Sequence, residues 1–244
     1  NLLVKLLCIA VNRVATLDPE NIGMELEADK PGWNDSMNGL PGILGSSLCE
    51  TLELEKALKL LCEICGALRL NDVKIYRELY DFMTELERSL GRRLVSDRKD
   101  RKFRFWNESH NVKEAYRERT RYGVSGEEVS LPVGRIERFS AKALALLSEM
   151  YLPENRRKVF SKEGVPYTYY RNEAFLFDYI KGKDGNRKLH SSGNPLVAPK
   201  KFRFMPLPLF LEGPVHMLKV HPEKGAAVYK AVRKSSMFDR KLKM

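Results

Sequence analysis

Two consecutive stripes of apolar residues constrain the fold of this chain most strongly. Over residues 48–68, and again over 72–90, leucines and other apolar side chains recur at intervals of three and four. Because an α-helix turns once in 3.6 residues, this spacing places the apolar side chains on one face. Ser47 and Glu50 have the S-x-x-E spacing of a capping box before the first stripe, and Gly91 is placed to end the second. The sequence therefore predicts two amphipathic helices here.

The same criterion predicts helices elsewhere. The opening residues NLLVKLLCIAVNRVATL are apolar enough to suggest a signal segment, but Lys5 and Arg13 interrupt them, and we interpret them as a buried amphipathic helix. Further helices are expected over about 108–122, 138–151 and 223–241. Residues 165–180 crowd aromatic and β-branched side chains together, which favours extended structure or a short hairpin. We expect a mainly α fold with long loops and a minor extended or β segment.

The composition limits the classes of protein to which this chain can belong. The chain is 43% hydrophobic, enough for one substantial core or part of a larger domain, and it contains no run of eighteen uncharged apolar residues that would predict a membrane span. The pair 62-CEIC-65 has redox or zinc spacing but lies on a predicted helix, without a second CxxC or a histidine pair. We therefore interpret the cysteines as core thiols, predict no metal site and expect a reducing compartment, the cytoplasm.

The formal net charge of +11 raises the question of nucleic acid binding. Residues 88–106 carry the densest basic run, interleaved with aromatic residues as a base-stacking platform would be. Asp97 and Asp100 interrupt the run, however, and the chain has no RRM, KH or helix-turn-helix signature. We interpret the stretch as a solvated connector with a few buried aromatics. Binding of anions, including phosphate, is compatible with the charge.

The segment 29-DKPGWNDSMNGLPGILGSS-47 is too rich in glycine and proline for a regular helix or strand. A carboxyl such as Asp35, packed against the indole of Trp33, would have a raised pKa and could donate a proton to a leaving oxygen. The indole could also pack on a sugar ring, and the amides of Asn34 and Asn38 suit hydroxyl groups. The alternative is structural: Asp35 caps a helix and Trp33 anchors the core.

The run 33-WNDSMN-38 resembles the WNDGMN motif of the cellobiose phosphorylase group of glycoside phosphorylases. The wider string KPGWNDSMNGLPGILGSS looks like a long-protein branch of that group, and 207-LPLFLEGPVHMLKV-220 resembles it less specifically. The close match covers about twenty residues, and looser likeness extends over most of the chain. Two departures concern the branch and the substrate: Ser36 stands where the family commonly has Gly, and Pro31-Gly32 replaces the usual lead into the Trp.

The resemblance implies part of an (α/α)₆ toroid barrel, with Asp35 as the general acid and Trp33 as a sugar-contacting residue. It implies inverting phosphorolysis of a β-linked glucan or disaccharide, with inorganic phosphate as co-substrate and no further cofactor. An inverting hydrolase on the same barrel is one alternative, and it would need a second carboxylate as base. Glu25, Glu27 and Glu50 are candidates for that base, each disfavoured. The other alternative is a non-catalytic helical binding or scaffold protein.

The rest of the chain adds few candidate residues. The four histidines lack metal-ligand spacing, and His216 is interpreted as a hydrogen-bonded core histidine. Glu173 and Glu212 could line a sugar cleft, but hydrogen-bonding roles are favoured for both.

Both ends of the sequence read as cuts through a longer protein, since the chain opens and closes inside helical patterns. We therefore expect residues 1–244 to form one incomplete catalytic domain. Its core helices would cover about 1–151, an irregular extended segment about 152–210 and a helical part 211–244. The isolated fragment is expected to be inactive, with the phosphate-binding elements of the family beyond Met244. Oligomeric state and sugar specificity stay open.

Overall fold

The computed structural model of the protein describes residues 2–26, 43–68, 70–191 and 193–242. The segment 27–42, which contains the WNDSMN motif, lies outside these ranges.

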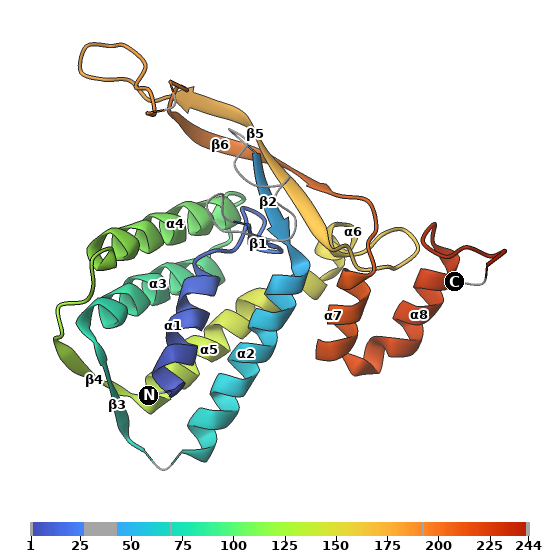
Figure 1. Ribbon diagram of the computed structural model, residues 1–244, viewed down its shortest axis with the longest axis horizontal. Coiled ribbons are helices and arrows are strands. Elements are labelled where there is room, and N and C mark those ends of the chain that lie inside the picture. Colours follow the sequence, from blue (N-terminus) through green and yellow to red (C-terminus); the bar gives the residue numbers. More distant parts are fainter. Residues whose placement is uncertain (1, 27–42, 69, 192, 243–244) are drawn as a thin grey trace.

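Five helices form the main body (Figure 1). They are α1 (Leu2–Val14), α2 (Leu48–Ala67), α3 (Arg77–Val95), α4 (Arg101–Thr120) and α5 (Val133–Ser148). Helix α2 packs against α5 and α1, and α3 packs against α4 and α5. Their facing stripes make one continuous apolar core, in which Leu7, Leu52, Leu58 and Phe139 are completely buried. The predicted N-terminal helix and the helix of the first stripe are thus confirmed.

The local signals around these helices were partly misleading. Ser47 is the N-cap residue of α2, but its side chain makes no capping hydrogen bond, so the predicted capping box is wrong. Gly91 does not end α3, which continues to Val95. The second predicted helix also begins late, because residues 72–76 form strand β3.

Strand β3 (Asp72–Tyr76) pairs with β4 (Glu128–Pro132) in an antiparallel two-stranded sheet. Val73 and Ile75 are buried while their neighbours are exposed, which is the alternation of a strand with one face on the core. A pair of apolar residues two positions apart fits this strand, and Ile75 also fits the helical stripe that follows. Only the pairing of residues 72–76 with the distant strand β4 decides between a strand and a longer helix.

The other described strands build a four-stranded antiparallel sheet in the order β1-β2-β5-β6. They are β1 (Met24–Glu25), β2 (Ile43–Ser47), β5 (Tyr169–Tyr179) and β6 (Val197–Pro206). Strands β5 and β6 form a long arm that passes the helical body and extends beyond it (Figure 1). The far part of the arm exposes large apolar side chains: Phe175, Leu176, Phe177, Tyr179 and Ile180.

The C-terminal part places two helices beside the main body. After the short helix α6 (Arg156–Val159) and the β5–β6 arm come α7 (Glu212–Val220) and α8 (Gly225–Lys234). Helix α7 packs against α2, which brings residues 212–220 next to the helix that follows the motif segment (Figure 1). Three 3₁₀ turns, Glu149–Tyr151, Pro153–Asn155 and Pro222–Lys224, connect described elements.

The expected fold class is wrong. The described residues combine helices with two antiparallel sheets, and they do not show the ring of helical hairpins that makes an (α/α)₆ toroid. The extended part is not minor, because β5 has eleven residues and β6 has ten. The aromatic residues of 165–180 did predict extended structure, but their long-range partners in β2 and β6 were not recognisable in the sequence. Among the described residues, no helix combines the length and the apolar character needed to cross a membrane.

Candidate functional site

The four residues expected to act on a sugar, Trp33, Asn34, Asp35 and Asn38, lie outside the described residues. The chain on both sides of them is described. Leu26 donates its backbone N–H to the carbonyl of Gly45 at 2.9 Å, and Met24 pairs with Ser47 across the β1–β2 ladder. The two flanks of the motif segment are therefore held side by side at the edge of the four-stranded sheet.

A buried polar cluster lies beneath these flanks. Asp18 is completely buried, and its carboxylate accepts hydrogen bonds from the backbone N–H groups of Glu20, Ile22 and Gly23. It also accepts the hydroxyl of Ser46 at 2.8 Å. Complete burial outweighs these hydrogen bonds and raises the pKa of Asp18 to about 6. On its other side Ser46 accepts the side-chain amide of Asn172 at 3.1 Å, so the cluster links the 18–23 turn, β2 and β5.

The carboxylates proposed as a hydrolytic base are differently placed. Glu25 is buried and accepts the indole N–H of Trp106. Glu50 is exposed and forms an ion pair with Arg13 at 3.6 Å. Glu27 lies outside the described residues.

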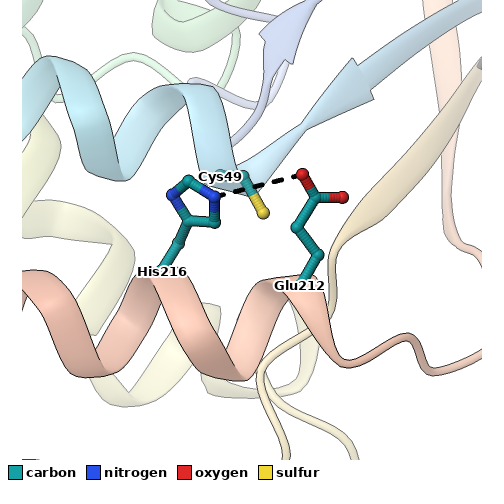
Figure 2. Close-up of side chains that lie close together, drawn as sticks. All are labelled: Cys49, Glu212 and His216. Atoms are coloured by element: carbon teal, nitrogen blue, oxygen red, sulfur yellow. Dashed lines mark ion pairs between the residues drawn. The ribbon is translucent and has the colours of Figure 1, made fainter. Parts of the chain in front are cut away.

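A second group of reactive side chains meets where α7 packs on the start of α2. Figure 2 shows Cys49 pointing from the first turn of α2 toward Glu212 and His216, which project from successive turns of α7. One ligand atom from each residue lies within 4.8 Å of the other two. Nε2 of His216 is 4.0 Å from Oε1 of Glu212. Sulfur, imidazole nitrogen and carboxylate oxygen are together the donor set that zinc takes in proteins.

Neighbouring residues orient two of these three side chains. Tyr169, the first residue of β5, donates its hydroxyl to Oε2 of Glu212 at 2.6 Å. Glu53, one turn beyond Cys49 on α2, lies 2.9 Å from Nδ1 of His216. The outer atoms of both residues are thus held, while Oε1 of Glu212 and Nε2 of His216 face each other and the thiol (Figure 2).

The thiol of Cys49 is neutral in the absence of a cation. Its burial, reinforced by the nearby carboxylate of Glu212, raises its pKa to about 12. A thiol in that state is a poor nucleophile at neutral pH. A bound divalent cation would reverse the balance, because it stabilises the thiolate and the carboxylate together.

Sequence reasoning did not bring this group together. The Glu212 and His216 spacing of four residues, which puts both on one face of a helix, was the available signal. Cys49 comes from a distant helix, and only the packing of α7 on α2 places it between them. The expectation that His216 is hydrogen-bonded is confirmed by its contact with Glu53, and its side chain is 19% exposed rather than fully in the core.

The 62-CEIC-65 pair does not form such a site. Cys65 is buried in the apolar core and Cys62 is half-buried on the same helix, with its sulfur 4.0 Å from the carbonyl of Glu137. Within the described ranges, neither residue belongs to a group of side chains spaced to hold a metal.

The basic stretch 88–106 spans the end of α3 and the start of α4. Five arginines there border a cavity of about 170 Å³: Arg92, Arg93, Arg98, Arg101 and Arg104. Each lies within 4 Å of a carboxylate, namely Glu108, Glu149 or Asp100. Phe105 and Trp106 are buried, so neither offers an open face for stacking on a base. The stretch is an ion-paired junction between two helices.

Comparison with models of known protein families and with curated proteins found no match for this chain.

Proposed function

We propose that the protein is an enzyme of carbohydrate metabolism that cleaves β-linked glucans or disaccharides by inverting phosphorolysis. The observation that carries this proposal is the string 33-WNDSMN-38, with its resemblance to the cellobiose phosphorylase motif. It combines one acid with an indole and two amides, the side chains that a sugar site requires.

In the proposed reaction Asp35 is the general acid. Its carboxyl proton passes to the glycosidic oxygen as the bond from that oxygen to the anomeric carbon breaks. Hydrogen phosphate attacks the same carbon from the opposite face, and the new carbon–oxygen bond has inverted configuration. The proton of the hydrogen phosphate then restores the carboxyl group of Asp35. The products are a sugar 1-phosphate and the shortened glycan, so no second catalytic carboxylate is needed.

The described residues beside the motif support this proposal. A general acid must be held within about 3 Å of the atom that it protonates, so the chain that carries it needs firm anchoring. Pairing of β1 with β2 and the cluster of Asp18, Ser46 and Asn172 anchor both flanks of residues 27–42. The four cysteines are free thiols, which agrees with the proposal of a reducing, cytoplasmic location.

The test measures sugar 1-phosphate formed from β-linked glucans and disaccharides by the full-length protein, with and without inorganic phosphate. We expect phosphate-dependent product with the wild type and a loss of at least about 1,000-fold in kcat with Asp35→Asn, because the amide is not acidic enough to protonate the leaving oxygen. Asp29→Asn, a change of another acid in the same segment, is the matched control and should keep its activity.

Each other outcome contradicts part of the proposal. Reducing sugar released without phosphate would assign a hydrolase instead. If phosphorolysis survives the Asp35→Asn change, Asp35 is not the general acid. Absence of turnover on all the β-glucosides would contradict the phosphorolysis proposal and favour a carbohydrate-binding or scaffold role, in which the motif has a structural task.

A further inference from the structure

We propose that Cys49, Glu212 and His216 bind one divalent transition-metal ion of the zinc class. This site is separate from the proposed sugar chemistry, and its test does not depend on that chemistry.

The geometry of the three ligand atoms carries the proposal. All lie within 4.8 Å of one another, and zinc bonds of about 2.0–2.3 Å place tetrahedral ligands roughly 3.3–3.8 Å apart. Small rotations of the three side chains would bring the ligand atoms to the distances of a tetrahedral zinc site. The backbone already provides the arrangement, because Glu212 and His216 occupy one face of α7 and Cys49 lies on the first turn of α2 (Figure 2).

The surrounding hydrogen bonds resemble the outer shell of a metal site. Metal-binding histidines usually have their second ring nitrogen on a carboxylate, and ligating carboxylates are themselves hydrogen-bonded. Here Glu53 lies on Nδ1 of His216, which leaves Nε2 for a cation. Tyr169 donates to Oε2 of Glu212, which leaves Oε1. Two ligands are thus oriented in advance.

Charge also favours a cation. A buried thiol beside a carboxylate cannot ionise easily, whereas a divalent ion compensates the thiolate and the carboxylate with its two positive charges. Binding breaks the S–H bond, forms a metal–sulfur bond and releases one proton to solvent. Side chains of Glu212 and His216 are 32% and 19% exposed, so the ion can enter from solvent and take water as its fourth ligand.

Such a site would clamp α7 to the start of α2, next to the flank of the motif segment. The close approach of Gly213 to residues 167–168, which lead into β5, fits this rigid junction. A Cβ added there would lie 2.7 Å from both the hydroxyl of Thr168 and the carbonyl oxygen of Tyr167.

Cobalt(II) is the probe for the experiment, because a cobalt–thiolate bond gives a charge-transfer band in the near ultraviolet and a four-coordinate ion gives visible d–d bands. We expect the full chain to bind one equivalent with both features and to lose them when zinc is added.

Variants distinguish metal binding at this site from metal binding at other thiols of the chain. Cys49→Ser should abolish the charge-transfer band, whereas Cys62→Ser on the same helix should keep it. Glu212→Gln and His216→Gln, both at partly exposed positions, should each weaken binding at least tenfold in a folded chain, checked by circular dichroism. Glu53→Gln should weaken it by about 10–100-fold, as loss of an outer-shell carboxylate does.

Zinc should also raise the Tm of the wild type and of Cys62→Ser, but not that of Cys49→Ser. Absence of the cobalt–thiolate band at millimolar cobalt would overturn the proposal. So would a band that persists in Cys49→Ser, or zinc affinity that is the same in the wild type and in Glu212→Gln and His216→Gln.

Discussion

Single residues beneath the motif flanks decide how closely the chain can pack there. Gly23 faces Ser46 and Asp18 so closely that an added Cβ would lie 2.6 Å from the hydroxyl oxygen of Ser46 and 2.8 Å from Oδ2 of Asp18. Ser46 and Asp18 are both fully buried and hydrogen-bonded to each other, so neither can move aside freely. At this position the absence of a side chain is a packing requirement rather than a matter of backbone freedom.

Gly23→Ala should therefore lower the free energy of unfolding by about 1–3 kcal/mol, the cost of overpacking a closed site. Urea titration followed by circular dichroism measures this loss. A variant as stable as the wild type would mean that the contact between the 18–23 turn and β2 is looser than the distances indicate.

The buried carboxyl of Asp18 predicts how the stability of the protein depends on pH. Its pKa rises from 3.8 to about 6 on burial, so the folded state holds the proton more firmly than the unfolded state does. The resulting stabilisation is present below pH 3.8 and is lost as the pH rises through 6. Asp18→Asn removes this titration, although the amide also loses acceptor capacity for the N–H groups that it faces.

Wild type and Asp18→Asn should be compared by urea unfolding at pH 4.5 and 7.5. The stability advantage of the wild type should be larger at pH 4.5, by about 2 kcal/mol. If the stability difference between the two proteins is the same at both pH values, the pKa of Asp18 is not raised on folding. The hydrogen bonds to its carboxylate would then offset the effect of burial.

At the scale of elements, α3 shows how weak a local stop signal can be. Gly91 follows the apolar stripe where a C-cap glycine would stand, yet α3 continues through it to Val95. Leu90 is completely buried, and Arg93, in the next turn, is 2% exposed, so tertiary contacts beyond the glycine hold the extra turn. Packing outweighs the helix cost of glycine, which is about 1 kcal/mol relative to alanine.

Gly91→Ala should then raise the free energy of unfolding by about 0.5–1 kcal/mol, because nothing lies within 4 Å of the added Cβ. This variant is the counterpart of Gly23→Ala: the same chemical change, with opposite expected signs in the same assay. A loss of stability at Gly91 would contradict the open surroundings of that position.

At the scale of the whole molecule, one buried cation joins segments that are far apart in the sequence. Arg93 donates two hydrogen bonds to the carboxylate of Glu149, at 2.6 and 3.1 Å, and a third to the side chain of Asn21 at 3.1 Å. It therefore ties α3 to the turn beside Asp18 and to the 3₁₀ turn after α5. Arg101, 3.6 Å from Glu149, adds a second positive charge at the same carboxylate.

Arg93→Met should lower the free energy of unfolding by about 3 kcal/mol, since it leaves Glu149 with a weaker partner in a poorly hydrated place. Changing both residues, Arg93→Met with Glu149→Leu, should cost less than the single change. Arg98→Met, at an exposed ion pair with Asp100, is the control and should leave the urea midpoint unchanged. A double variant that is less stable than Arg93→Met would show that the pair itself, not the unpaired charge, carries the effect.

The sequence by itself determined the elements whose signal is local. Apolar residues at helical spacing predicted α1 and α2, and crowded aromatic residues predicted extended structure near Tyr169. These patterns can be recognised within one segment because each element must bury one apolar face, whichever other element packs against that face. The WNDSMN string likewise carries a chemical hypothesis in six adjacent residues.

Tertiary structure alone decided the pairing of β3 with β4, the four-stranded sheet and the absence of a toroid among the described helices. It also decided the meeting of Cys49 with Glu212 and His216, and of Arg93 with Glu149. Each of these contacts joins residues from distant parts of the chain. Their energy depends on packing and desolvation in the assembled core, and no spacing within one segment encodes that.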